Sequence, residues 1–213
     1  MDVLLLLAYG LHVVVDGPGV DPWWARPFRS ATLWNGGQDG SLLEHFGQLQ
    51  TALAAILLFG FARRGSRWQV LPVLGGVLLL LVADDLFGLH ERTGRALAPM
   101  LHGSGLHLEG AQEVGGLLLW VAVGVVGAAG LLPAAARSCP EARRIARKLL
   151  LVAVPLVIVA VGYVAFRAVA PEPVYEELVD IAVAVRVTTK LLTATAILSA
   201  VLHARHRRPP WST

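Results

Sequence analysis

Apolar segments of membrane-spanning length recur along the chain, and they limit the folds that it can adopt. A helix needs about 20 apolar residues to cross the roughly 30 Å hydrocarbon core of a bilayer, and it satisfies its own backbone hydrogen bonds there. We therefore predict an all-α fold, in which residues 1–213 form a single membrane domain. This polytopic transmembrane bundle has about six spans, approximately at residues 3–15, 42–62, 68–89, 110–133, 149–168 and 178–204.

The first of these segments, residues 3–15, is marginal because it contains only thirteen residues. A secretory signal peptide is not expected, since no basic residue precedes the apolar run and no clear cleavage site follows it. Two interpretations remain: a helix that tilts and packs short, or a span whose start is truncated. The following residues, 16–41, contain prolines, glycines and tryptophans and are expected to form an outer loop, which could lie over the bundle as an interfacial lid.

Composition supports a membrane environment and argues against a nucleic-acid partner. Charged residues make up 15% of the chain, whereas an average globular protein has about 25%. The isoelectric point of about 9.5 could suggest nucleic-acid binding, but the basic residues occur in short clusters and form no continuous patch. Because Cys139 is the single cysteine of the sequence, an intramolecular disulfide and a cysteine-based metal site are both excluded. The lipid bilayer is the expected partner.

The basic clusters predict the orientation of the chain. Eleven of the 18 lysines and arginines follow the second, fourth and sixth segments, whereas thirteen of the fifteen acidic residues lie at the opposite ends. By the positive-inside rule, both termini face the cytoplasm, and the acidic ends face the exterior of a bacterial inner membrane. The basic residues are Arg63, Arg64 and Arg67, then Arg137, Arg143, Arg144, Arg147 and Lys148, and finally Arg205, Arg207 and Arg208.

Several acidic and histidine residues lie a turn or more inside apolar sequence, where an ionised carboxylate is costly unless it is paired. They are Glu44 and His45 in the second segment, Asp84, Asp85, His90 and Glu91 at the end of the third, and Glu109 and Glu113 in the fourth. In the last segment Arg186 and Lys190 are four residues apart and should also face the interior, with Arg186 level with the two aspartates.

A compact site that uses all residues of the third segment requires a break in the helix. On a continuous helix Asp84 and Glu91 would share a face but stand roughly 10 Å apart along the axis, and His90 would point away from both. Gly88 is the expected place for the helix to unwind.

A divalent-metal enzyme is the preferred functional hypothesis. Carboxylates combined with imidazoles suit Zn, Fe or Mn, and a bound metal could activate water against a lipid-like substrate or support oxidation. The predicted ligands are Glu44, His45, Asp84, Asp85, His90, Glu91 and Glu109. Glu113 is the candidate general base, and Arg186 and Lys190 would bind a substrate anion or balance charge. The chain lacks a His-Glu-x-x-His, a paired Glu-x-x-His or a His-x-x-x-His motif, so the spacing does not identify the metal.

Three alternatives stay open. The buried charges could neutralise one another and only fix the register of the helices. A proton or cation transporter or channel is another possibility, because intramembrane carboxylates beside a deep lysine suit a proton relay. The polar face could also dock a partner as an accessory subunit of a membrane complex, or serve a homo-oligomer.

Two short segments carry a resemblance to a known group of proteins. Residues 39–44 read Asp-Gly-Ser-Leu-Leu-Glu, and residues 84–91 read Asp-Asp-Leu-Phe-Gly-Leu-His-Glu. Together with a lysine in the last helix, they resemble small uncharacterised bacterial membrane proteins that share D-G-S-x-x-E and D-D-x-x-x-x-H-E segments. The resemblance implies that Glu44, Asp84, Asp85, His90, Glu91 and Lys190 form one site, and it carries no agreed activity. Alkaline-ceramidase-like hydrolases have zinc histidines with no equivalent spacing here.

Overall fold

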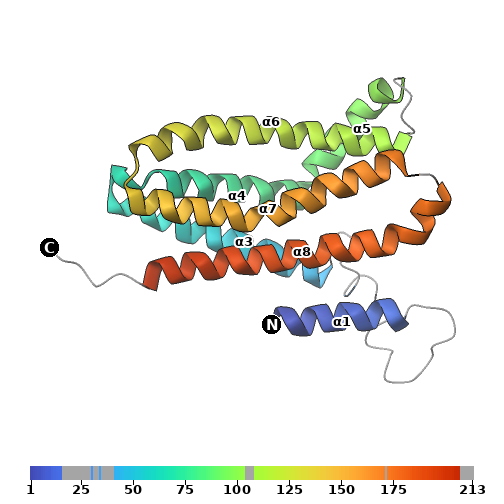
Figure 1. The fold of residues 1–213 in the computed structure, drawn as a ribbon, viewed down its shortest axis with the longest axis horizontal. Helices are drawn as coiled ribbons and strands as arrows, with labels where there is room; N and C mark the ends of the chain where they lie inside the picture. Colours follow the sequence, from blue (N-terminus) through green and yellow to red (C-terminus); the bar gives the residue numbers. More distant parts are fainter. Residues whose placement is uncertain (16–29, 31–33, 35–40, 104–107, 171, 207–213) are drawn as a thin grey trace.

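Helices lie side by side along the length of the molecule in a computed structural model (Figure 1), which describes residues 1–15, 30, 34, 41–103, 108–170 and 172–206. Within these residues the regular structure is entirely helical, which confirms the predicted all-α class. The α-helices are α1 (Asp2–Val15), α3 (Leu42–Phe59), α4 (Val70–Phe87), α5 (Leu89–His102), α6 (Leu108–Arg137), α7 (Pro140–Val169) and α8 (Glu172–His206). Short 3₁₀ helices at Gly60–Arg64 and Ser66–Trp68 join α3 to α4.

Five helical segments in the described residues are long and apolar enough to cross a membrane. Their most apolar windows have mean hydropathies between 1.3 and 2.8. They are Leu42–Arg64, Val70–Phe87, Gly110–Arg137, Pro140–Val169 and Glu177–His206. The first predicted segment also forms a helix, α1, but its apolar part, Asp2–Val13, is shorter than a full span. These properties support a multi-pass membrane protein.

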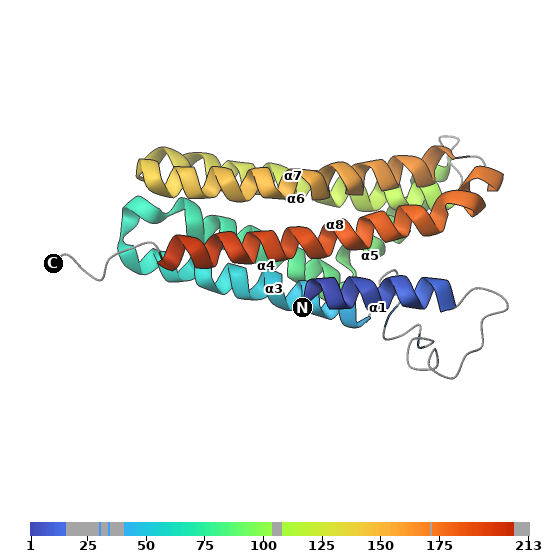
Figure 2. The same cartoon turned by 60° about the horizontal axis from the view of Figure 1, so that its bottom comes forward.

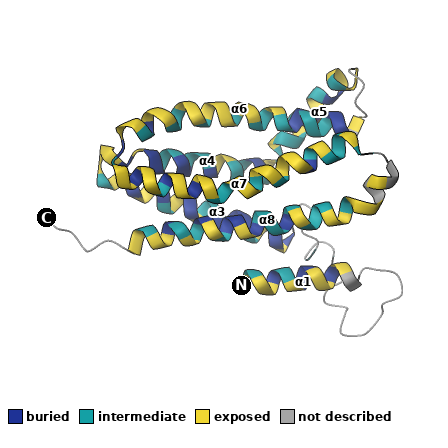
Figure 3. Cartoon of the chain, viewed as in Figure 1, coloured by how far each residue is buried: buried dark blue, intermediate teal, exposed yellow. Residues whose placement is uncertain are grey.

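The burial pattern indicates which helices need an apolar environment outside the chain. Only 6% and 11% of the most apolar windows of α6 and α7 are buried inside the protein, against 39% for those of α3 and α4. Figure 3 shows the long exposed faces of α6 and α7, which carry residues such as Val126 and Ile158. Because such faces are unfavourable in water, they support a lipid environment.

The α3–α4 and α6–α7 connections lie next to each other at one end of the bundle, which we call the basic end. The backbone N–H of Cys139 donates to the carbonyl of Arg67 at 2.8 Å. The Ser138 hydroxyl donates to the Ala134 carbonyl at 2.7 Å and accepts from the backbone N–H of Val70 at 3.1 Å. Two of the predicted basic clusters therefore lie together, and the opposite end, which carries the acidic residues, is called the acidic end.

The half of the bundle next to the basic end has a mainly apolar core. Its largest fully buried side chains, Leu58, Phe61, Leu71 and Val201, are at most 1% exposed. Around them pack side chains of α3, α4, α7 and α8, namely Ala54, Ala55, Leu74, Leu78, Leu149 and Ile197. This core closes the bundle on the side away from the acidic residues.

Helix α1 covers the acidic half of the surface formed by α3 and α8 (Figure 2). Leu5 and Tyr9 pack against Val187 and Leu191 of α8. At the start of α1 the Asp2 carboxylate accepts hydrogen bonds from Gln50 Nε2, at 3.3 Å, and from the Thr195 hydroxyl. Asp2 is one of the two acidic residues that the sequence does not place with the other thirteen, and in the structure it belongs to a polar network midway along α3.

The predicted lid falls mostly outside the described residues. Of residues 16–41 the structure describes Ser30, Trp34 and Ser41. Trp34 packs against the cluster that contains Leu5, Tyr9 and Leu43, and so lies beside α1 and the start of α3.

Candidate functional site

The break at Gly88 shapes the centre of the site. Helix α4 ends at Phe87, and Gly88 adopts a left-handed conformation with φ 57° and ψ 42°. Its N–H donates to the carbonyl of Asp84, and α5 begins at the next residue, Leu89. Glycine adopts this conformation readily because it lacks a Cβ atom. The predicted unwinding at Gly88 is therefore confirmed.

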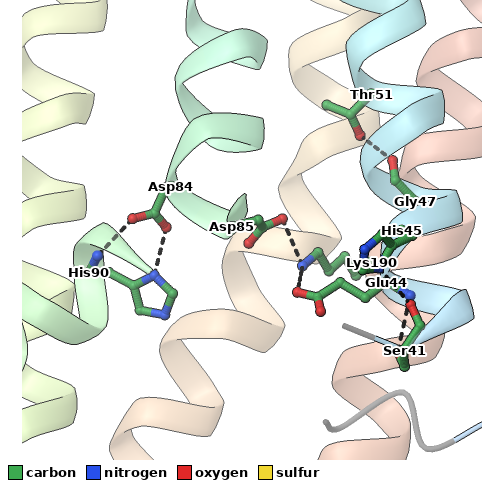
Figure 4. A network of polar contacts seen from close by, with 9 residues as sticks. All are labelled: Ser41, Glu44, His45, Gly47, Thr51, Asp84, Asp85, His90 and Lys190. Atoms are coloured by element: carbon green, nitrogen blue, oxygen red, sulfur yellow. Dashed lines mark hydrogen bonds and ion pairs between the residues drawn. The ribbon is translucent and has the colours of Figure 1, made fainter. Parts of the chain in front are cut away.

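This break brings His90 back to Asp84, which holds the histidine through both carboxylate oxygens (Figure 4). Asp84 Oδ1 accepts from the backbone N–H of His90 at 2.7 Å, and Oδ2 lies 2.6 Å from His90 Nδ1. The Asp84 side chain is 4% exposed, whereas that of His90 is 35% exposed. When Nδ1 donates to the carboxylate, Nε2 keeps its lone pair for a proton or another ligand.

The Asp84 carboxylate also changes the basicity of this imidazole. The side-chain hydrogen bond to Asp84 raises the pKa of His90 above its usual value, and this effect outweighs the opposing effect of burial.

Next to this pair, Lys190 joins two carboxylates from different helices. Its Nζ lies 2.8 Å from Asp85 Oδ2 and 3.8 Å from Glu44 Oε1. Glu44 is in the first turn of α3, where the Ser41 hydroxyl caps the helix and accepts from the backbone N–H of Glu44 at 3.3 Å. The ammonium group therefore links α3, α4 and α8 at the acidic end.

An open recess of about 240 Å³ lies between these groups. Five of the seven predicted metal ligands line this first recess: Glu44, His45, Asp85, His90 and Glu91, together with Gln48, Leu86 and Gly88. Asp84 lies behind His90 rather than in the lining. The side chain of Glu109 lies outside the described part of the chain.

The described residues do not form a ready-made metal cluster. No three His, Cys, Asp or Glu side chains among them are placed to hold an ion together. Lys190 lies within ion-pair distance of both Glu44 and Asp85, and both oxygens of Asp84 are engaged by His90. In this arrangement the Lys190 ammonium balances charge on the two carboxylates.

A second open recess, of about 300 Å³, lies on the other side of His90 and Glu91. Its remaining lining is Gln112, Glu113, Gly116, Tyr163, Arg167 and Arg186. Glu113, predicted as a general base, forms an ion pair of 2.6 Å with Arg167. Arg186 lies with its guanidinium carbon 4.5 Å from the centre of the Tyr163 ring.

Sequence analysis did not single out Arg167 or Tyr163 for this site. Both residues lie in the predicted span 149–168, Tyr163 among apolar residues and Arg167 near the end of the span. Their separation of four residues, which places them on one face of α7, was the available signal.

Three glycines bring α5 close to α6 and so place His90. A Cβ atom on Gly115 would lie 2.9 Å from the Cα of Gly94, and one on Gly116 would lie 3.2 Å from the His90 carbonyl oxygen. A Cβ on Gly94 would collide with the Gln112 carbonyl oxygen. This spacing leaves no room for side chains, so α6 supports the first turn of α5 directly.

Comparison with known proteins identifies a family but no activity. A family model described as Domain of unknown function (DUF8692) matches residues 4–187, and this chain belongs to that family. The match agrees with the resemblance to an uncharacterised family. No curated protein and no solved structure matches the chain.

Proposed function

We propose that this member of the DUF8692 family is a membrane-embedded enzyme in which His90 acts as a general base on a membrane-soluble substrate. The observation that carries the proposal is the Asp84–His90 pair, whose imidazole borders both recesses while Asp84 is buried. A general base needs an accessible lone pair and a fixed orientation, and this pair supplies both.

In the proposed reaction a water oxygen attacks an ester, amide or phosphoester bond while His90 Nε2 accepts a proton from that water. The same nitrogen then returns the proton to the leaving group. Arg186, which lines the second recess, is the nearby cation available to stabilise developing negative charge, whereas Lys190 is paired with Asp85 and Glu44. Glu113 is less suited to the role of base that the sequence suggested, because it is paired with Arg167.

The distribution of polar side chains favours an enzyme over a channel. From the acidic end, polar groups extend as far as Gln50 and Thr195. Beyond that level the described core is mainly apolar, with side chains such as Leu58, Leu71 and Val201, and the buried Ser138 hydroxyl is hydrogen-bonded at the basic end. A one-sided site suits a substrate that enters and leaves from the same face, whereas conduction needs a polar path across the bundle.

A divalent metal ion, Zn, Fe or Mn, is our second proposal for the first recess, because five predicted ligands line it. Binding would require the Lys190 ammonium to move away from Glu44 and Asp85. The hydrogen bond between Asp84 and His90 Nδ1 would then orient the imidazole, and Nε2 would be the nitrogen that binds the metal. A carboxylate behind a metal-bound histidine is a common arrangement.

Substitution of His90 tests both proposals. We expect His90→Gln to lower kcat by about 10²–10⁴-fold on whichever substrate of a lipid ester, amide and phosphoester panel the wild type hydrolyses. His102→Gln, an exposed change on the same helix, is the matched control. Equal activity of the two variants would rule out His90 as the base. If chelators abolish turnover and Zn, Fe or Mn restores it, the reaction depends on a bound metal. If chelators leave turnover unchanged, the metal proposal is wrong.

The pH profile gives the same experiment a second readout. His90 works as a base only when neutral, so the wild-type rate should fall as pH decreases through its raised pKa. Asp84→Asn removes the hydrogen-bonded carboxylate that raises this pKa, and should move the fall in rate to lower pH. An unchanged profile would contradict the assignment.

We also propose the orientation that the charges predict for the bundle, with the C-terminus and the basic end in the cytoplasm of a bacterial inner membrane and both recesses facing the exterior. The start of α1 lies level with Gln50 and Thr195, midway along the bundle, and not at the basic end. The single cysteine, Cys139, lies at the basic end and reports on it directly.

A membrane-impermeant maleimide should leave Cys139 unlabelled in intact cells and label it after lysis. A His102→Cys variant in a Cys139→Ser background should be labelled in intact cells as well as after lysis, since His102 is exposed at the acidic end. Labelling of Cys139 in intact cells would reverse the proposed orientation.

A further inference from the structure

Arg186 is a cation for which the described residues supply no carboxylate partner within ion-pair distance. It lies in the candidate span Glu177–His206 and borders the second recess. Its described contact is with the ring of Tyr163, 4.5 Å from the guanidinium carbon. A cation inside a membrane span is costly and usually marks a functional site.

The two carboxylates that line the same recess have other partners. Glu113 pairs with Arg167 at 2.6 Å, and Glu91 with Arg95 at 3.5 Å. Arg186 therefore adds a positive charge that these carboxylates do not balance. Stacking on Tyr163 holds the plane of the guanidinium and leaves its N–H donors available to an anion.

The lining also indicates which shape of anion would fit this recess. Arg167 comes from α7, Arg186 from α8 and the Gln112 amide from α6, so donors approach from three helices. Donors in several directions suit a tetrahedral phosphate better than a planar carboxylate, and arginine binds phosphate oxygens in pairs. A volume of about 300 Å³ holds a small headgroup, while the exposed apolar faces of α6 and α7 lie next to it for acyl chains.

We propose that the second recess binds the phosphate group of an anionic lipid-like molecule through Arg186, with Arg167 and Gln112 as further donors. His90 borders the same recess, so the bound lipid would present its headgroup beside the proposed base. Only this last step, which makes the phospholipid-like molecule a substrate, rests on the proposed function.

Binding to purified protein in an uncharged detergent tests the proposal without any turnover. The probes are dioctanoyl phosphatidic acid, inorganic phosphate and uncharged dioctanoylglycerol, and the measurement is the Kd of each. We expect Arg186→Gln to weaken phosphatidic acid binding by about ten-fold or more, since it removes charge-assisted hydrogen bonds. Arg92→Gln makes the same charge change at an exposed residue of α5 that lines neither recess, and should leave the Kd unchanged.

The outcomes distinguish a lipid headgroup from free phosphate as the ligand, and they distinguish failure of the binding proposal from failure of the enzyme proposal. Tighter binding of phosphatidic acid than of inorganic phosphate identifies a lipid headgroup, and equal binding identifies the free ion as a sufficient ligand. If neither binds, or if Arg186→Gln binds both as tightly as the wild type does, the proposal is wrong. Wild-type protein that binds phosphatidic acid, loses this binding in Arg186→Gln and hydrolyses no substrate of the panel would contradict the proposed enzyme alone and leave the binding site standing. Arg186→Lys, which keeps the charge, checks that weaker binding does not come from misfolding.

Discussion

Replacing Lys190 with methionine is expected to lower the free energy of unfolding by about 2 kcal/mol. The change leaves Glu44 and Asp85, whose side chains are only 13% and 24% exposed, without the cation that neutralises them. Breaking a fully buried pair costs about 3–5 kcal/mol, and the 35% exposure of Lys190 places this case below that range. Thermal unfolding in detergent, followed by tryptophan fluorescence, measures the loss.

A second substitution shows whether charge is the cause. Lys190→Met combined with Asp85→Asn removes one of the two carboxylates that lose the Lys190 ammonium, and should recover part of the stability. Lys190→Met alone with wild-type stability would mean that the ion pairs contribute little, and a double variant less stable than the single one would point to packing. Either result would also weaken the resemblance-based grouping of Glu44, Asp85 and Lys190 in one site.

Adding one methyl group at Gly115 should destabilise the contact between α5 and α6 by about 1–3 kcal/mol, the usual cost of overpacking a close contact. The new Cβ would meet the Cα of Gly94 at 2.9 Å and its carbonyl oxygen at 3.1 Å, and backbone atoms cannot rotate away. Because α5 begins one residue before His90, the displacement should also reduce activity that depends on His90.

Gly124 offers a matched control in the same helix. A Cβ there meets no atom within 4 Å, so Gly124→Ala changes only helix propensity. That change should be neutral or stabilising by up to about 1 kcal/mol. Denaturation of the two variants side by side in one detergent measures the contrast. Equal stability of Gly115→Ala and Gly124→Ala would show that the two helices do not approach as closely as the structure places them.

Several features of the site could be predicted from local sequence. The need for a break between Asp84 and His90 follows from helix geometry, and Gly88 is the residue that best tolerates it. These predictions involve residues within one or two turns of each other, where the spacing along the chain limits the distance in space.

Partners on different helices could not be predicted in this way. The sequence placed Glu113 and Arg186 in the interior but did not pair Glu113 with Arg167, or place Arg186 on Tyr163. Those contacts depend on the rotation of each helix about its axis. A turn of a few tens of degrees would exchange the residues that face the interior without changing the apolar pattern.

The sequence by itself determined the helical class, the membrane environment and the separation of acidic from basic ends, because these depend on composition and periodicity along one segment. Only the tertiary structure decided which charges neutralise one another, that Lys190 lies close to both Glu44 and Asp85, and that His90 borders two recesses. The physical reason is that apolar contacts are non-directional and many rotations of a helix satisfy them. The close approach of helices at glycines and the short range of ion pairs select one rotation for each helix.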